Sequence, residues 1–203
     1  MRPVDQLDLL LTQLGYPGGQ VPAEEQDYFS EEFALFAPLF TRGWLLRFDA
    51  EGDFFQEGAH SRIMRALLAL ASLVEFPEVR DRWAAGWLFE IDDGERLVAH
   101  HLPSDEASPS DYAELLLVAS VLDAWLPEHT LLDLNTGDQS ACLCMAPTAV
   151  YEALVAEGFI DPDREEAFYP QEDELVLPPG EDLDAFDAQV VKLDRDGRAA
   201  LLA

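Results

Sequence analysis

Residues 87–101 have the sequence WLFEIDDGERLVAHH, and this stretch decides the fold class. It contains two runs rich in aromatic and aliphatic residues, 87–91 and 97–101, which flank the dipeptide Asp93-Gly94. An Asp-Gly pair between two such runs is a strong local signal for an antiparallel hairpin with a tight turn. In the first strand Trp87, Phe89 and Ile91 share one face and are bulkier than the residues of the other face, so we expect their face to be buried.

A second hairpin is predicted further along the chain. The apolar runs 131–134 and 141–145 flank residues 135–138, whose sequence NTGD is typical of a turn. A further strand is expected at 43–49. Apolar residues spaced three and four apart, together with caps, predict helices at 4–14, 28–40, 62–75 (capped by Ser61), 77–83, 109–125 and 147–157. These elements indicate an α+β fold, in which helices cover a mostly antiparallel or mixed sheet built from two hairpins.

The composition changes after the last predicted helix. Residues 161–187 contain eleven carboxylates, four prolines and a single base, Arg164, which favours an extended arm over a packed element. We therefore expect a single domain with an α+β core at 1–160, an acidic Pro-rich arm at 161–187, and a C-terminal strand or hairpin at 188–203 that packs on the core. The Asp-Gly pair at 196–197 suggests that residues 199–202 return as a strand.

The net charge excludes some classes of partner. The chain has 41 Asp and Glu residues against 12 Lys and Arg residues, giving a net charge of −29, and Lys192 is its single lysine. Phosphate binding needs clustered bases, so we expect neither nucleic acid nor an anionic membrane surface as a partner. No apolar run approaches the roughly 20 residues of a membrane span. Asp5 and Asp8 interrupt any secretory signal, so a cytoplasmic location is expected.

Two cysteines, Cys142 and Cys144, are separated by one residue. On a strand this spacing places both on one face, and it suits neither an ordinary disulfide nor a structural zinc site. We expect buried free thiols. The acidic turn sequences lack the spacing of a calcium loop, so neither a metal nor another cofactor is expected.

A catalytic site has weak candidates. His100 and His101 would point to opposite faces of a strand, and one of them could join His129 and Asp133 in general acid-base chemistry. This is the enzyme alternative, a small hydrolase. No nucleophile elbow, zinc-binding helix or phosphate-binding glycine loop accompanies these residues. The sequence therefore favours a protein that is not an enzyme.

The interpretation that the sequence favours is an interaction protein that docks a cationic protein partner. Complementary charge steers such encounters and discriminates against other partners. The partner could be a basic nuclease or toxin, which would make this an immunity-type or inhibitor protein, or a DNA-binding protein. One alternative is that the acidity only keeps the protein soluble. Another is adaptation to high salt, which would account for the near absence of lysine. The expected binding residues are the acids of the arm: Asp161, Asp163, Glu165, Glu166, Glu172, Asp173 and Glu174.

Overall fold

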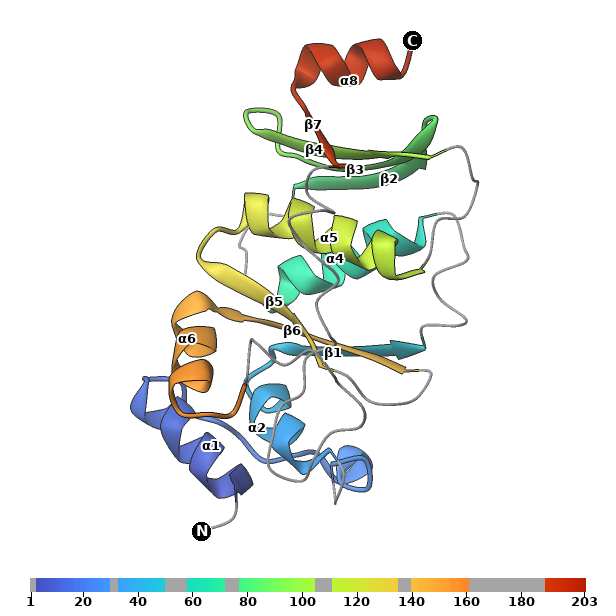
Figure 1. The fold of residues 1–203 in the computed structure, drawn as a ribbon. Coiled ribbons are helices and arrows are strands. Elements are labelled where there is room, and N and C mark those ends of the chain that lie inside the picture. The colour runs from blue at the N-terminus through green and yellow to red at the C-terminus, as the bar shows by residue number, and fades with distance from the viewer. Residues whose placement is uncertain are drawn as a thin grey trace. The chain divides into compact units, whose positions relative to one another are not determined.

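The computed structural model describes seven stretches of the 203-residue chain: residues 3–29, 33–49, 58–71, 77–104, 111–134, 140–160 and 189–203. The chain forms two compact units, each built from an early and a late stretch. Unit 1 comprises Met1–Ala50 and Glu128–Gly180, and unit 2 comprises Glu51–Pro127 and Glu181–Ala203. Each has its own sheet, and every strand pair is antiparallel. The predicted α+β class is confirmed (Figure 1).

Unit 1 contains a three-stranded sheet in the order β1-β6-β5. Its strands are β1 (Leu45–Asp49), β5 (His129–Asp133) and β6 (Ser140–Pro147). The predicted hairpin at 131–145 is confirmed, with Leu131 opposite Met145. Figure 1 shows the α-helices of this unit on one side of the sheet: α1 (Pro3–Gln13), α2 (Ala37–Phe40) and α6 (Thr148–Ala156).

The core of unit 1 combines leucines from α1 with a cluster of aromatic rings. Leu7 and Leu11 are fully buried, and they belong to the same cluster as Phe36, Cys142 and Cys144. Both cysteines are free and buried, as predicted. Burial, and then the neighbouring Cys142, raises the pKa of the Cys144 thiol far above its ordinary value. The thiol is therefore protonated at neutral pH and behaves as a small apolar side chain.

Unit 2 contains a four-stranded sheet in the order β2-β3-β4-β7. Its strands are β2 (Glu78–Trp83), β3 (Gly86–Asp92), β4 (Leu97–Pro103) and β7 (Val191–Leu193). The predicted hairpin around Asp93-Gly94 is confirmed, with Phe89 opposite His100. At the β2–β3 turn Gly86 has φ +132°, and an added Cβ would lie 2.2 Å from the Leu102 carbonyl oxygen. Only glycine fits there.

Helices cover both faces of the unit 2 sheet. Figure 1 shows α4 (Ala59–Leu70) and α5 (Asp111–Trp125) on one face and α8 (Arg195–Leu201) on the other. Phe89 and Ile91 are buried on the first face, as predicted. Leu88 and Glu90, on the second face, are buried as well, because this face is also covered.

Two predicted helices in the first half of the chain are wrong. In the described part of the stretch 28–40, turns and two short helical segments, η2 (Ala34–Phe36) and α2, replace the expected helix. Pro38 sits in the first turn of α2, where the ring is tolerated but cannot continue a helix from upstream. The helix expected over 77–83 is strand β2, because its backbone pairs with β3 from Glu78 to Trp83. The pairing outweighs the helix-starting signal of Pro77.

Two further details differ from the predictions. The strand expected at 199–202 is the end of helix α8. Asp194 is the N-cap of this helix, and its Oδ1 accepts a hydrogen bond from the Gly197 amide at 2.7 Å. Ser61 does not cap α4, because it lies inside the helix and its hydroxyl bonds back to the Gly58 carbonyl. Gly58, in the left-handed conformation, precedes the first helical residue.

Among the described residues, no helix is both long and apolar enough to cross a bilayer.

Candidate docking site

Helix α1 carries leucine on its exposed side as well as on its buried face. Leu7 and Leu11 are fully buried, whereas Leu9 is 46% exposed. An α-helix turns about 100° per residue, so Leu9 projects almost opposite to its two buried neighbours. The exposed Leu9 and the neighbouring Leu10, which is partly buried against the core, form an apolar strip along this side of α1.

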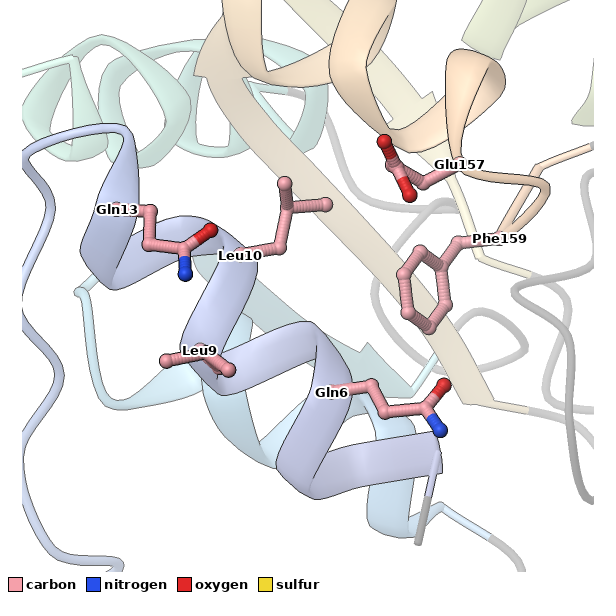
Figure 2. Close-up of a pocket in the computed structure, with 6 residues that line it drawn as sticks. All are labelled: Gln6, Leu9, Leu10, Gln13, Glu157 and Phe159. Carbon is pink, nitrogen blue, oxygen red and sulfur yellow. The ribbon is translucent and has the colours of Figure 1, made fainter. Parts of the chain in front are cut away.

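A groove of about 300 Å³ lies along this strip. Figure 2 shows α1 on one side of it and the segment that follows α6 on the other. Its lining residues are Gln6, Leu9, Leu10, Gln13, Glu157 and Phe159. All of them belong to unit 1.

The end of α6 places two of the lining residues. Glu157 is the C-cap of α6, and Gly158 follows it with φ +78°, a conformation that favours glycine. The reversed chain then closes on the helix, because the Phe159 amide donates to the Leu154 carbonyl at 2.9 Å. As a result the Phe159 ring and the Glu157 carboxylate both border the groove.

The groove combines apolar and polar chemistry. The exposed Leu9 offers most of the hydrocarbon surface, since Leu10 is partly buried and Phe159 is only 8% exposed. The two glutamine amides can both donate and accept hydrogen bonds. Glu157 adds a carboxylate at the rim. None of the six lining residues is a histidine, cysteine, serine or threonine, so the groove lacks the nucleophiles and imidazole bases of common hydrolases. The arrangement suits binding of an amphipathic group with a positive charge.

Acidic residues dominate the described part of unit 1. It contains two arginines, Arg42 and Arg47, and ten carboxylates: Asp5, Asp8, Glu24, Glu25, Asp27, Asp49, Glu128, Asp133, Glu152 and Glu157.

Both arginines of this part are engaged inside the unit. The Arg42 side chain is only 2% exposed, and its guanidinium bonds to Asp8 at 2.9 Å and to the carbonyls of Tyr16 and Pro38. Arg47 lies 3.8 Å from the ring centre of Tyr28 and pairs with Glu25 at 3.7 Å. Neither guanidinium lines the groove, so neither adds positive charge to its lining, although Arg42 offsets the charge of Asp8 on α1.

In unit 2 three arginines surround one buried carboxylate. Glu90 is 1% exposed, and its oxygens accept bonds from Arg80 at 3.2 Å, Arg82 at 2.5 Å and Arg198 at 2.9 Å. Burial alone would raise the pKa of Glu90, but the arginines outweigh it and lower the pKa below its ordinary value. This cluster ties helix α8 to the sheet through Arg198.

A second buried pair lies on the opposite face of the same sheet. His60 of α4 is 1% exposed, and its Nδ1 lies 3.4 Å from a carboxylate oxygen of Asp81. The rings of Trp87 and Phe89 lie 5.3 and 5.0 Å from the imidazole. Burial opposes ionisation of Asp81, yet hydrogen bonds from His60 and Ser61 lower its pKa. The pair is enclosed by aromatic side chains and helps to fix α4 on the sheet.

The histidines proposed for catalysis are buried within unit 2. His100 is 3% exposed and its Nδ1 lies 2.9 Å from the Ser120 hydroxyl of α5. His101 is 6% exposed and its Nε2 lies 2.9 Å from the Ala84 carbonyl oxygen. Consecutive strand residues point to opposite faces, as expected. Each imidazole thus has a structural partner.

The other two candidates lie in unit 1, on strand β5. His129 and Asp133 are four residues apart on one strand, so they share a face but lie about 13 Å apart along it. That separation is too long for a direct hydrogen bond. Burial lowers the pKa of His129, an effect that the nearby Glu128 partly offsets. Burial also raises the pKa of Asp133 to about 6.

The predicted binding residues of the acidic arm, 161–187, lie outside the described residues, as does the turn at 135–138. Within the described part of the chain, no three His, Cys, Asp or Glu side chains are grouped so as to hold a metal ion.

Sequence reasoning missed the six residues of the groove. One signal was available: Leu9 is an apolar residue off the buried stripe of an otherwise regular amphipathic helix. Phe159 carries no such signal, because its position depends on how the chain folds back after Gly158. Comparison of the chain with protein families, with curated proteins and with solved structures finds no match.

Proposed function

We propose that this protein is a non-enzymatic interaction protein that docks a cationic protein partner, in the manner of an immunity protein or inhibitor. The observation that carries the proposal is the charge of the described part of unit 1: ten carboxylates against two arginines, both engaged within the unit. A surface with this imbalance attracts a basic protein and accelerates encounter. The acidic sequence 161–187 extends the same sign of charge.

The proposal places the protein in the cytoplasm, because the free thiols of Cys142 and Cys144 persist most readily in a reducing compartment. The cationic partner is a basic nuclease or toxin, or another protein that normally binds phosphate. Carboxylates on the acidic surface would occupy the guanidinium and ammonium groups with which such a partner binds nucleic acid.

The experiment has two stages. Immobilised protein is used to capture basic proteins from host lysate at low salt, and salt elution is followed by identification. Association of the purified partner is then measured by surface plasmon resonance with wild type and with the variant Glu172→Gln, Asp173→Asn, Glu174→Gln. We expect a lower association rate in the variant, and a difference that shrinks as salt rises, because the Debye length falls to about 8 Å near physiological ionic strength.

A matched control removes the same charge from unit 2. The variant Glu95→Gln, Asp123→Asn, Asp196→Asn changes three exposed carboxylates there, and we expect it to associate at nearly the wild-type rate. An association rate that is indifferent to salt and to both sets of substitutions would contradict the proposal and leave the acidity as a solubilising feature.

A further inference from the structure

We propose that the groove between α1 and the Glu157–Phe159 segment binds a short amphipathic segment of the cationic partner, with an apolar side chain against Leu9, Leu10 and Phe159 and a lysine or arginine on Glu157. This inference rests on the proposed function and gives it a binding site. It concerns only described residues of unit 1.

The size of the groove fits an amino-acid side chain of a bound peptide better than a small metabolite. Its volume of about 300 Å³ is at the lower limit of pockets that enclose small molecules, which span roughly 300–1,000 Å³. The groove holds one or two side chains of a peptide. Leu9, 46% exposed in the free protein, gains most from being covered.

The electrostatics of the two flanking helices select a positive charge. Helices α1 and α6 have no lysine or arginine, and neither has a basic residue in its last turn. Gln13 is the last residue of α1 and Glu157 is the C-cap of α6, so both C-terminal ends border the groove. Each helix C-terminus carries a partial negative charge, and a cation nearby stabilises it.

The polar lining then fixes how the segment lies. Gln6 and Gln13 are seven residues apart on α1, about two turns, with the leucines between them. Their amides can form hydrogen bonds with polar groups of the bound segment, on either side of the apolar side chain that this segment places in the groove. Lysine and arginine fit this geometry well, since their hydrocarbon stems lie on apolar surface while the charged head reaches a carboxylate.

The first test is a titration of the ¹⁵N-labelled full chain with a synthetic helical peptide of leucine, alanine and lysine, its leucines spaced three and four apart. We expect shifts of the side-chain amide signals of Gln6 and Gln13 and of the backbone signals of Leu9, Glu157 and Phe159. A peptide with glutamate in place of lysine should leave these signals unchanged.

The second test uses two matched pairs of variants and the affinity for the lysine peptide. Leu9→Gln should weaken binding about tenfold, while Leu14→Gln should not, because Leu14 is similarly exposed, at 41%, but does not line the groove. Glu157→Gln should weaken binding about threefold at low salt, whereas Glu152→Gln, an exposed position on the same helix, should have little effect.

The outcomes separate this inference from the proposed function. Equal affinity of Leu9→Gln and wild type for the lysine peptide overturns the groove as the site, while salt-dependent docking of a cationic partner would still stand. Equal binding of the lysine and glutamate peptides overturns the cationic specificity. Failure of both the peptide and the lysate capture refutes the two proposals together. Shifts at the groove that grow with protein concentration alone would assign it to a second copy of the chain.

Discussion

The two units of this molecule use their charged residues in different ways. The described part of unit 2 has eight bases for eleven carboxylates, whereas that of unit 1 has two for ten. In unit 2 arginines converge on Glu90, and its pKa is lowered. In unit 1 the partly buried Asp133 has a raised pKa, because its desolvation is not compensated by a base. In unit 2 several arginines pair with carboxylates, whereas the described part of unit 1 has few bases to offset its negative charge.

The largest expected effect comes from breaking the buried cluster of unit 2. Glu90→Gln leaves three guanidinium groups facing a neutral amide, so we expect the free energy of unfolding to fall by about 3 kcal/mol. Urea denaturation at pH 7 measures this. Asp92→Asn, which removes a more exposed pair with Arg195, serves as the control and should cost much less. Equal losses in the two variants would mean that burial does not set the strength of these pairs.

The next effect has the opposite sign and lies in unit 1. Burial raises the pKa of Asp133 to about 6 from an ordinary value of 3.8, so at pH 7 its ionised form destabilises the folded state. Asp133→Asn should therefore raise the free energy of unfolding by about 2–3 kcal/mol at pH 7. As pH falls from about 6 to the ordinary value of 3.8 the gain should shrink, and it should vanish at about pH 3, where the wild-type carboxyl is neutral in both states. A gain that is independent of pH would assign the effect to packing.

Acid should accordingly affect the two units in a definite order. The lowered pKa values of Asp81 and Glu90 give stability that is complete above their ordinary values of 3.8 and 4.5 and is lost as pH falls through the folded-state values. Protonation of Asp133, by contrast, stabilises unit 1 as pH falls from about 6 towards 3.8. Hydrogen exchange followed by NMR from pH 7 to 3, corrected for intrinsic rates, should show β3 losing protection before β6. Simultaneous loss, or the reverse order, would contradict this difference between the units.

The smallest expected effect concerns the helix that carries Arg198. Asp194→Ala removes the N-cap bond to the Gly197 amide, and we expect a loss of about 1 kcal/mol in the free energy of unfolding. If α8 is held mainly through Glu90, the cap should matter less once that carboxylate is gone. A double-mutant cycle with Glu90→Gln measures this coupling. Strict additivity would show that the cap and the arginine cluster act independently.

Two Asp-Gly pairs show how far the sequence alone leads. At Asp93-Gly94 the flanking residues alternate and favour strands, Gly94 has φ +93°, and the predicted hairpin is present. At Asp196-Gly197 the pair is followed by RAALLA, whose residues favour a helix, and Asp194 lies three positions ahead of the glycine as a cap. The dipeptide is identical in both places, and the residues around it decide the outcome.

Neither strand β2 nor the groove could be predicted from the sequence alone, because both depend on long-range packing. Val79 and the alternating arginines of β2 fit a strand, but it is the pairing with β3 that overrides Pro77, and pairing is a long-range property. The sequence shows the acidity of the chain and the extra leucine of α1. It does not show that Phe159 lines the same groove as that leucine, because this depends on the turn at Gly158 and on the packing of α6.

Strand β7 has a consequence for the order in which the chain is made. Ala99 of β4 pairs with Leu193, so the two strands are synthesised roughly ninety residues apart. While the ribosome is still adding the intervening residues, β2, β3 and β4 can pair, but the outer edge of β4 has no neighbour. An unpaired edge is a template for other chains. Nascent or truncated chains that end before Val191 should therefore depend on chaperones more than the finished protein does.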